Sequence, residues 1–273
     1  MSIIELRNIS KAFGGQEILR GVNLSINEGE TKIILGGSGQ GKSTILRLIL
    51  GFDTPDSGQI LIDDVDITQL SEEEMVPIRQ RMGMVFQESS LFDSMTVFNN
   101  IAYRYHEDGS MTDEEIVKRT ERLLQFVDLE KDDLVKLPEQ LSGGMKRRVA
   151  IARALAGQHK IMLYDEPTAG LDPITGSHIT ALMIRLRDLE KMTSVLVTQD
   201  LITSFQMSTH CAHMENDRIH IRISPNHTCT ASTKLVILKD GRILLEGTLS
   251  QLLQSTDPYV QQFLSSIKLV MPR

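Results

Sequence analysis

A glycine-rich loop between a strand-like and a helix-like segment restricts the folds open to this chain more than any other feature. Residues 36–44 read Gly-Gly-Ser-Gly-Gln-Gly-Lys-Ser-Thr and satisfy the pattern Gly-x-x-x-x-Gly-Lys-Ser/Thr. Residues 31–35 predict a short buried strand that leads into the loop, and residues 42–51 predict a helix after it. Backbone N–H groups at the start of a helix bind phosphate oxygens. The loop therefore predicts an α/β fold with a nucleotide site at the end of a strand.

The residues of this loop have separate expected roles. The glycines let the backbone curl around the β-phosphate, Lys42 neutralises phosphate charge, and the Ser43 hydroxyl binds Mg²⁺. We therefore predict ATP and Mg²⁺ as cofactors. The loop residues predicted to bind the nucleotide are Gly36, Gly37, Ser38, Gly39, Gln40, Gly41, Lys42, Ser43 and Thr44.

An Asp-Glu pair follows a buried-strand pattern at residues 161–164. Asp165 should end this strand with its carboxylate facing the Mg²⁺ site. Glu166 is then placed to orient and partly deprotonate a water molecule, so we expect hydrolysis rather than transfer to a bound acceptor. An isolated Asp-Glu pair at a strand end is often a solvated turn. Together with the loop at residues 36–44, it indicates a catalytic site.

The rest of the chain separates into a mixed core and a helical part. Residues 91–156 show helical patterns, with a capping box at residues 112–115, and predict a helical subdomain inserted into the core. We expect an ATPase domain over residues 1–249 and a C-terminal helical tail over residues 250–273. Other strands are predicted at residues 3–7, 18–26, 59–62, 82–86, 194–198, 235–239 and 242–245, and other helices from Ser71, Pro173, Thr248 and about Asp257.

Residues 207–233 fit neither pattern well and look like an atypical insertion. They hold four of the seven histidines and both cysteines. His210, Cys211 and His213, together with His227 and Cys229, offer the nitrogen and thiolate ligands that Zn²⁺ prefers, but their spacing is not that of standard zinc knuckles. A zinc site and a histidine-rich surface insertion are both open interpretations.

Residues 141–155, which begin Leu-Ser-Gly-Gly-Met, resemble the signature helix of ABC-type ATPases, which usually begins Leu-Ser-Gly-Gly-Gln. The resemblance covers residues 1–206 and 234–249, with the motifs in the order of the family. It implies a P-loop NTPase with a RecA-like core, an antiparallel β subdomain and an inserted helical signature subdomain. It also implies a head-to-tail dimer, in which Ser142, Gly143 and Gly144 of one copy close over the γ-phosphate held by Lys42 of the other.

The same resemblance assigns roles to single positions. Phe13 corresponds to the aromatic residue that stacks on adenine, Gln87 to the loop glutamine that contacts Mg²⁺ and water, and Asp172 to the loop that crosses the dimer interface. Gln199 stands where most members have histidine. Its amide can donate a hydrogen bond to the γ-phosphate but does not titrate near neutral pH, so turnover is expected to be slow or differently controlled. The expected catalytic residues are Lys42, Glu166 and Gln199, and the expected metal ligands are Ser43, Gln87 and Asp165.

The composition of the chain limits the partners and the cellular compartment that we expect for it. The formal net charge of -7, from 29 basic and 36 acidic residues, argues against a dedicated nucleic-acid binder. The basic run at residues 146–148, with Arg153, is expected to be a solvated helix face or to serve the ATP dimer. Two cysteines predict a reducing compartment without a disulfide framework. No signal-peptide core is visible, and no apolar run approaches the about 20 residues that span a bilayer, so work at a membrane would need a partner.

Three stretches, residues 143–155, 164–174 and 256–266, resemble the ATPases of Mla/Mce-type phospholipid transporters. This resemblance implies an ATPase on the cytoplasmic face of the inner membrane that drives a separate permease docked near residues 87–98. A lipid-binding Mce-type substrate protein and a small regulatory subunit are further implied partners. Two alternatives are open: an ATPase of an importer for amino acids or other small solutes, and a soluble non-transport ABC ATPase or weakly hydrolysing regulator.

Overall fold

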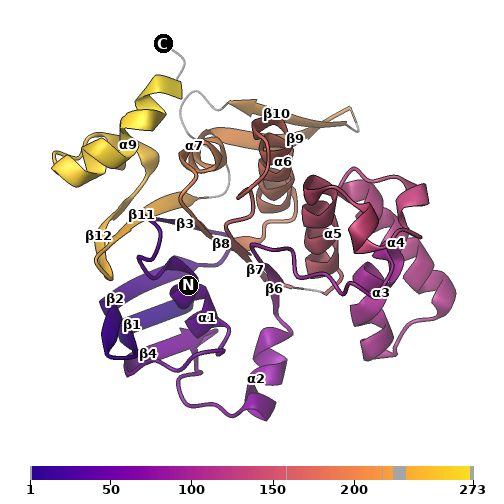
Figure 1. The fold of residues 1–273 in the computed structure, drawn as a ribbon, viewed down its shortest axis with the longest axis horizontal. Coiled ribbons are helices and arrows are strands. Elements are labelled where there is room, and N and C mark those ends of the chain that lie inside the picture. The colour runs from indigo at the N-terminus through magenta and orange to yellow at the C-terminus, as the bar shows by residue number, and fades with distance from the viewer. Residues whose placement is uncertain (1, 158, 217, 224–231, 271–273) are drawn as a thin grey trace.

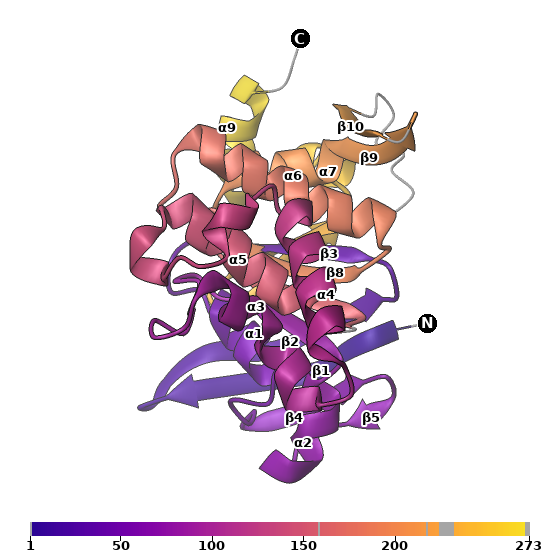
Figure 2. The same ribbon diagram turned by 90° about the vertical axis from the view of Figure 1, so that its right-hand side faces the viewer.

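The computed structural model describes residues 2–157, 159–216, 218–223 and 232–270. It contains a six-stranded sheet, a four-stranded antiparallel sheet and a group of helices that stands to one side of both (Figure 1). Figure 2 looks onto that side, where α3, α4 and α5 lie in front of the sheets. In the described part of the chain, no helix combines the length and the apolar character needed to cross a membrane.

The six-stranded sheet positions the nucleotide loop. Its strands run in the order β12–β11–β3–β8–β7–β6, and β12 alone is antiparallel to its neighbour. Successive residues of the central strands face opposite cores: Ile34 and Val195 belong to one, Ile33 and Leu196 to the other. Strands buried on both faces read as continuous apolar runs, which is why the central strands are predictable. The strands are β3 (Thr31–Leu35), β6 (Met82–Val85), β7 (Ile161–Asp165), β8 (Thr193–Thr198), β11 (Thr233–Lys239) and β12 (Arg242–Gly247).

The antiparallel sheet and α1 (Lys42–Ile49) cover one face of the main sheet. The order of the strands is β2–β1–β4–β5, with β1 (Ser2–Phe13), β2 (Gln16–Asn27), β4 (Ser57–Ile62) and β5 (Val65–Asp66). β1 and β2 are longer than residues 3–7 and 18–26, because register shifts, such as the one between Leu6 and Ile9, interrupt the alternation while pairing continues. α2 (Glu72–Arg79) begins after Ser71, whose side chain forms a capping box with Glu74.

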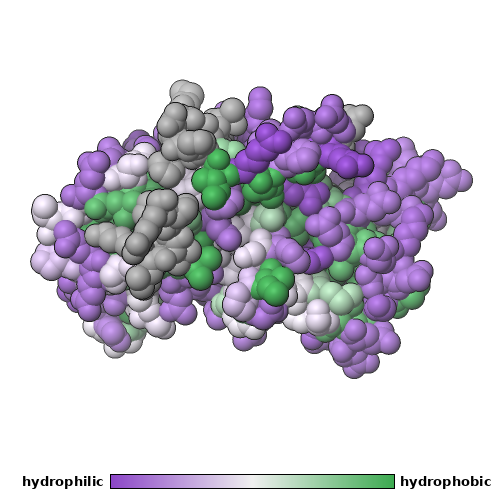
Figure 3. Space-filling model, turned by 90° about the horizontal axis from the view of Figure 1, so that it is seen from above, coloured by the Kyte–Doolittle hydropathy of each residue, from purple (hydrophilic) through white to green (hydrophobic). Residues whose placement is uncertain are grey.

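The other face of the main sheet is covered by α6 (Pro173–Leu189), α7 (Leu201–Thr209), α8 (Leu249–Leu253) and α9 (Pro258–Val270). Val260 and Leu264 of α9 are buried in the same core as Phe205 of α7, and the C-terminal helix packs against α7 and α8. Figure 3 shows these elements from above: hydrophilic residues cover most of this face, and hydrophobic residues form separate patches. The apolar residues of the upper helices therefore mostly point inward.

The helical part contains α3 (Val97–Asp108), α4 (Asp113–Phe126) and α5 (Gly143–Leu155), with 3₁₀ turns at Lys131–Asp133 and Pro138–Gln140. The capping box predicted at residues 112–115 is confirmed: Thr112 accepts from the Glu115 backbone N–H, and the Glu115 carboxylate accepts from the Thr112 backbone N–H. Helical structure begins at Val97, later than residue 91.

A hairpin that the sequence patterns did not predict follows α7. It consists of β9 (His210–Glu215) and β10 (Arg218–Ile223), which form a separate two-stranded sheet beside α6. Arg187 and Asp188 of α6 are buried and hold it: the Arg187 guanidinium donates to the His210 carbonyl at 2.6 Å, and Asp188 Oδ2 accepts from the Ala212 N–H at 2.7 Å. Cys211 is disulfide-bonded, so the expectation of no disulfide was wrong. Cys229 and His227 lie outside the described residues.

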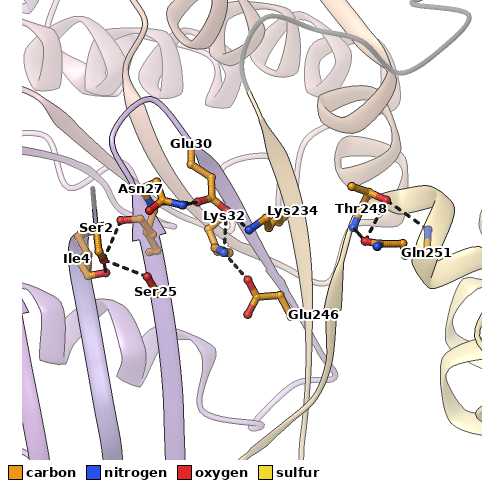
Figure 4. A network of polar contacts seen from close by, with 11 residues as sticks. Ser2, Ile4, Ser25, Asn27, Glu30, Lys32, Lys234, Glu246, Thr248 and Gln251 are labelled. Atoms are coloured by element: carbon orange, nitrogen blue, oxygen red, sulfur yellow. Dashed lines mark hydrogen bonds and ion pairs between the residues drawn. The ribbon is translucent and has the colours of Figure 1, made fainter.

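A buried ionic network joins β3 to β12 (Figure 4). The fully buried Lys32 ammonium lies 2.7 Å from Glu30 and 2.5 Å from Glu246. Burial raises the pKa of Glu30, but hydrogen bonds from Lys32 and from the Asn27 backbone outweigh it and bring the pKa below its ordinary value. The buried positive charge of Lys32 is therefore balanced by two carboxylates, those of Glu30 and Glu246.

Candidate nucleotide-binding site

The glycine-rich loop joins β3 to α1, as predicted, and its glycines are required by the geometry. Gly41 has φ +95° at the start of α1, and a Cβ there would lie 2.8 Å from the Leu19 side chain. A Cβ on Gly36 would lie 2.7 Å from the Leu238 carbonyl oxygen. Only glycine fits such positions without a shift of the backbone. The loop is thus a preformed cradle at a helix N-terminus, the arrangement that binds phosphate groups.

A cavity of about 350 Å³ opens over this loop. It brings together ten of the residues predicted from the sequence and one, Ile18 of β2, that was missed because it read as an ordinary strand residue. The cavity is lined by Phe13, Ile18, Ser38, Gly39, Gly41, Lys42, Ser43, Thr44, Gln87, Glu166 and Gln199.

Lys42 reaches back over the loop and is almost fully buried. Its ammonium donates to the carbonyl oxygens of Gly36 at 3.0 Å and Gly37 at 3.1 Å, and lies 3.5 Å from the Glu166 carboxylate. The charge that would meet phosphate is held in place by backbone acceptors of the loop itself. Gln40, in contrast, turns its side chain away from the cavity and accepts a hydrogen bond from the Asp240 backbone N–H.

Asp165 stands at the end of β7 beside the first turn of α1. The Ser43 hydroxyl donates to its Oδ1 at 2.9 Å. Burial raises the pKa of Asp165, the bond from Ser43 opposes this, and the nearby charge of Glu166 raises the pKa further. A carboxylate whose ionised form is disfavoured in this way is stabilised by a cation. Ser43 and Gln87 line the cavity, whereas Asp165 does not line it and reaches the site through its bond with Ser43. The hydroxyl, the carboxylate and the amide supply oxygen ligands of the kind that Mg²⁺ prefers.

Glu166 is held in a strained conformation that the sequence alone does not reveal. Its φ is +45°, uncommon for a residue other than glycine, and its N–H donates to the Val197 carbonyl at 2.9 Å. Its Oε2 accepts from the Thr198 hydroxyl at 2.9 Å and from the Gln199 N–H at 3.1 Å. Thr198 was missed, although it is the polar end of an apolar strand. These contacts leave the carboxylate at the cavity wall, where it can act on water.

The comparisons with known proteins agree with this geometry. A family model described as ABC transporter matches residues 19–169. The intermembrane phospholipid transport system ATP-binding protein MlaF of Haemophilus influenzae is 34% identical over 263 residues, which are 96% of this chain and 90% of that protein. The chain belongs to the ABC transporter family. The methionine import ATP-binding protein MetN 1 of Bacillus thuringiensis subsp. konkukian is 42% identical over 221 residues, 80% of this chain, and the match spans 65% of the length of that protein.

The ABC ATPase fold is also seen in a solved structure. The ATP-binding cassette MJ0796, a dimer in a post-hydrolysis state bound to ADP and Pi, matches with a TM-score of 0.75 and 34% identity over 90% of this chain and 98% of that chain. The family uses ATP with Mg²⁺, and the cradle, the buried Lys42 and the pair formed by Ser43 and Asp165 fit both.

The signature residues of this ABC ATPase lie away from its own cavity. Ser142 caps α5 and accepts from the Met145 N–H at 3.3 Å, and a Cβ on Gly144 would lie 2.3 Å from the Thr175 side chain of α6. Asp172 caps α6, and hydrogen bonds from Thr175 hold its pKa below the ordinary value. The N-termini of α5 and α6 therefore lie side by side, and neither they nor Gly143 line the cavity of the same chain.

The arginines of α5 have a role inside the chain, so the expectation of a solvated face was wrong for them. Arg147 is buried and donates to the Phe86 carbonyl. Arg153 donates to the carbonyls of Ser90 at 2.8 Å and Ser89 at 3.2 Å. These bonds fasten the signature helix to the loop that carries Gln87.

Proposed function

We propose that this chain is the ATP-hydrolysing subunit of a transporter that moves phospholipids through a separate permease. The observation that carries the proposal is the extent of the match with MlaF, which runs through 96% of this chain and 90% of that protein, whereas the match with MetN 1 leaves a third of that protein uncovered. The match with the phospholipid transport protein thus extends over nearly the whole chain, including residues beyond 249.

In this proposal, different residues of the site have different roles in ATP hydrolysis. Lys42 and the loop backbone hold the phosphates, while Ser43, Gln87 and Asp165 hold Mg²⁺. Bound ATP supplies the phosphoanhydride bond that is cleaved. The Glu166 carboxylate, held by the bond that Thr198 donates to its Oε2, takes the proton of the attacking water.

The remaining site residues act at the edges of the cavity. The Gln199 amide donates to phosphate without changing charge. Phe13 stacks on adenine, and its ring is half exposed with the Lys11 ammonium 5.1 Å from its centroid. Ser142, Gly143, Gly144 and Asp172 act on the nucleotide of a second copy in a head-to-tail dimer, because they lie away from the cavity of their own chain.

The permease would dock on the surface beside residues 87–98, at the cytoplasmic face of the membrane. Phe92 and Tyr103 are exposed there, with ring centroids 5.0 Å apart. Exposed aromatic pairs are typical centres of protein interfaces. A lipid-binding substrate protein and a small regulatory subunit complete the proposed assembly.

A second candidate is the ATPase of a methionine importer, which the higher identity to MetN 1 favours. Purification of the tagged chain from membranes of its own source in mild detergent separates the two. We expect a polytopic protein and glycerophospholipid to co-purify, and ATP hydrolysis by the complex to rise with added phospholipid but not with methionine. Stimulation by methionine alone would overturn the lipid assignment.

The ATPase assignment is tested on the same preparation. Glu166→Gln should reduce phosphate release to a small residual rate while ATP is still bound, and Gln199→His should keep or raise the wild-type rate. Full activity of Glu166→Gln would refute the role of Glu166, whatever the cargo.

A further inference from the structure

The hairpin formed by β9 and β10 places its side chains on two different faces. In a strand, successive side chains point to opposite faces, and directly paired residues share a face. One face packs toward the core, where Ala212 is buried and Ile219 and Ile221 contact the larger hydrophobic core. The opposite face carries the polar residues Cys211, His213, Glu215, Arg218, His220 and Arg222.

His213 and His220 stand directly opposite each other on this polar face. Directly paired residues of an antiparallel sheet have Cβ atoms about 4.5–5.5 Å apart. Both histidines are half-buried. The strand that carries His213 is fixed to α6 by the Arg187 and Asp188 contacts on either side of Cys211, so the spacing of the pair is set by the fold.

We propose that His213 and His220 bind one divalent transition-metal ion of the borderline class, such as Zn²⁺, Ni²⁺ or Cu²⁺, with water in the remaining positions. Neutral imidazole nitrogens bind such ions at about 2.0–2.1 Å, and two rings from adjacent Cβ atoms converge on one ion. Mg²⁺ prefers oxygen ligands and is not expected here.

This ligand set differs from the one that the sequence spacing suggested. His210 lies on the opposite face of β9, and the sulfur of Cys211 is in a disulfide rather than a thiolate. Across the described ranges, no group of three or more His, Cys, Asp or Glu side chains could hold a metal ion. The described part of the chain thus supplies two ligands, which predicts an exchangeable rather than a structural ion.

An ion pair lies on the same face and bears on the strength of the site. Arg222 donates to Glu215 at 2.6 Å, and both side chains are about half exposed. Arg222 follows His220 by two residues, so its positive charge opposes a bound cation. Removal of this charge should therefore strengthen metal binding, in contrast to removal of either histidine.

The experiment is calorimetric titration of the tag-free full chain with ZnCl₂ and, separately, NiCl₂, in buffer with excess Mg²⁺ to occupy oxygen sites. We expect one ion per chain, binding at least about tenfold weaker in His213→Ala and in His220→Ala, and tighter binding in Arg222→Ala. His106→Ala, at an exposed position of α3, is the matched control and should bind like the wild type. Thermal unfolding without metal verifies that each variant is folded.

Three outcomes would overturn the proposal. These are no saturable binding of either ion, binding that survives in the His213→Ala/His220→Ala double variant, and equal loss of binding in His106→Ala. None of them depends on ATP hydrolysis or on the transported molecule.

Discussion

Thr198→Val tests the placement of Glu166 more directly than any change in the glycine-rich loop. The Thr198 hydroxyl donates to Glu166 Oε2 at 2.9 Å and accepts from the Asp200 N–H at 2.9 Å. Valine keeps the shape of the side chain and removes both bonds. A hydrogen bond to a charged group contributes about 1.5–3 kcal/mol. If that free energy holds the carboxylate in its reactive position, kcat should fall about tenfold to a hundredfold.

Steady-state phosphate release at varied ATP concentration measures this effect. The KM for ATP should stay within about twofold, because Thr198 does not line the cavity and its loss removes no contact to substrate. Thr198→Ser keeps the hydroxyl and should retain most of the activity. Thermal unfolding of both variants measures any loss of stability from the unpaired Asp200 N–H.

The decisive comparison uses a double-mutant cycle with Glu166→Gln. If Thr198 acts through Glu166, Thr198→Val should change the residual rate of the Glu166→Gln variant by less than about twofold. An undiminished loss of activity in that background would show that Thr198 acts elsewhere, and our reading of the contact would be wrong.

Three further predictions concern stability. The buried Tyr164 hydroxyl has no hydrogen-bond partner among the described residues. Tyr164→Phe should therefore leave the free energy of unfolding in urea unchanged or raise it by up to about 1 kcal/mol. A clear loss of stability would show that the hydroxyl has a partner. Lys32→Met leaves Glu30 without its nearest cation and should lower the free energy of unfolding by about 3–5 kcal/mol. Most of this loss should be recovered in Lys32→Met/Glu30→Gln. A small loss of stability in Lys32→Met alone would contradict this prediction. Burial lowers the pKa of His159 below 6.5, although its hydrogen bond to the Gln80 carbonyl partly raises the pKa again. The imidazole therefore binds a proton more tightly in the unfolded chain than in the folded one. The contribution of His159 to stability is therefore complete above pH 6.5 and is lost as pH falls from there through the folded pKa; urea unfolding of wild type and His159→Gln over that range should show a flatter profile for the variant.

Local signals explain what could be predicted from the sequence. The strand, loop and helix around Lys42 are contiguous, and the Asp165–Glu166 pair ends an apolar strand, so both were found without any knowledge of distant contacts. Gln87 and Gln199 have no such local signal and came only from the family resemblance. The cavity nevertheless brings Lys42, Gln87, Glu166 and Gln199 together.

What the sequence did not reveal depends on contacts between distant segments. Arg147 looked like part of a charged helix face, but its partner is a carbonyl group 61 residues earlier in the chain. The run Arg-Ile-His-Ile-Arg-Ile of β10 has the alternation of a strand, yet residues 207–233 were interpreted only as an atypical insertion, either a zinc site or a histidine-rich surface segment. β10 pairs with β9, and β9 packs on α6, so the hairpin depends on tertiary contacts that periodicity along the chain does not reveal.

The contacts of α5 suggest how events at the cavity reach the outer surface. Arg153 donates to the carbonyls of Ser89 and Ser90, two and three residues after Gln87, and its guanidinium lies 5.4 Å from the centre of the Phe92 ring. Phe92 is in turn fixed by Asn100, whose side-chain oxygen accepts from the Phe92 N–H at 2.8 Å and whose amide donates to the Phe92 carbonyl at 3.1 Å. Each of these hydrogen bonds contributes little free energy alone. A movement of Phe92 that leaves Gln87 in place would have to break several of them at once. We infer that the signature helix, the Gln87 loop and the exposed aromatic pair move as one unit, so a partner docked on that surface would sense the cavity through rigid displacement.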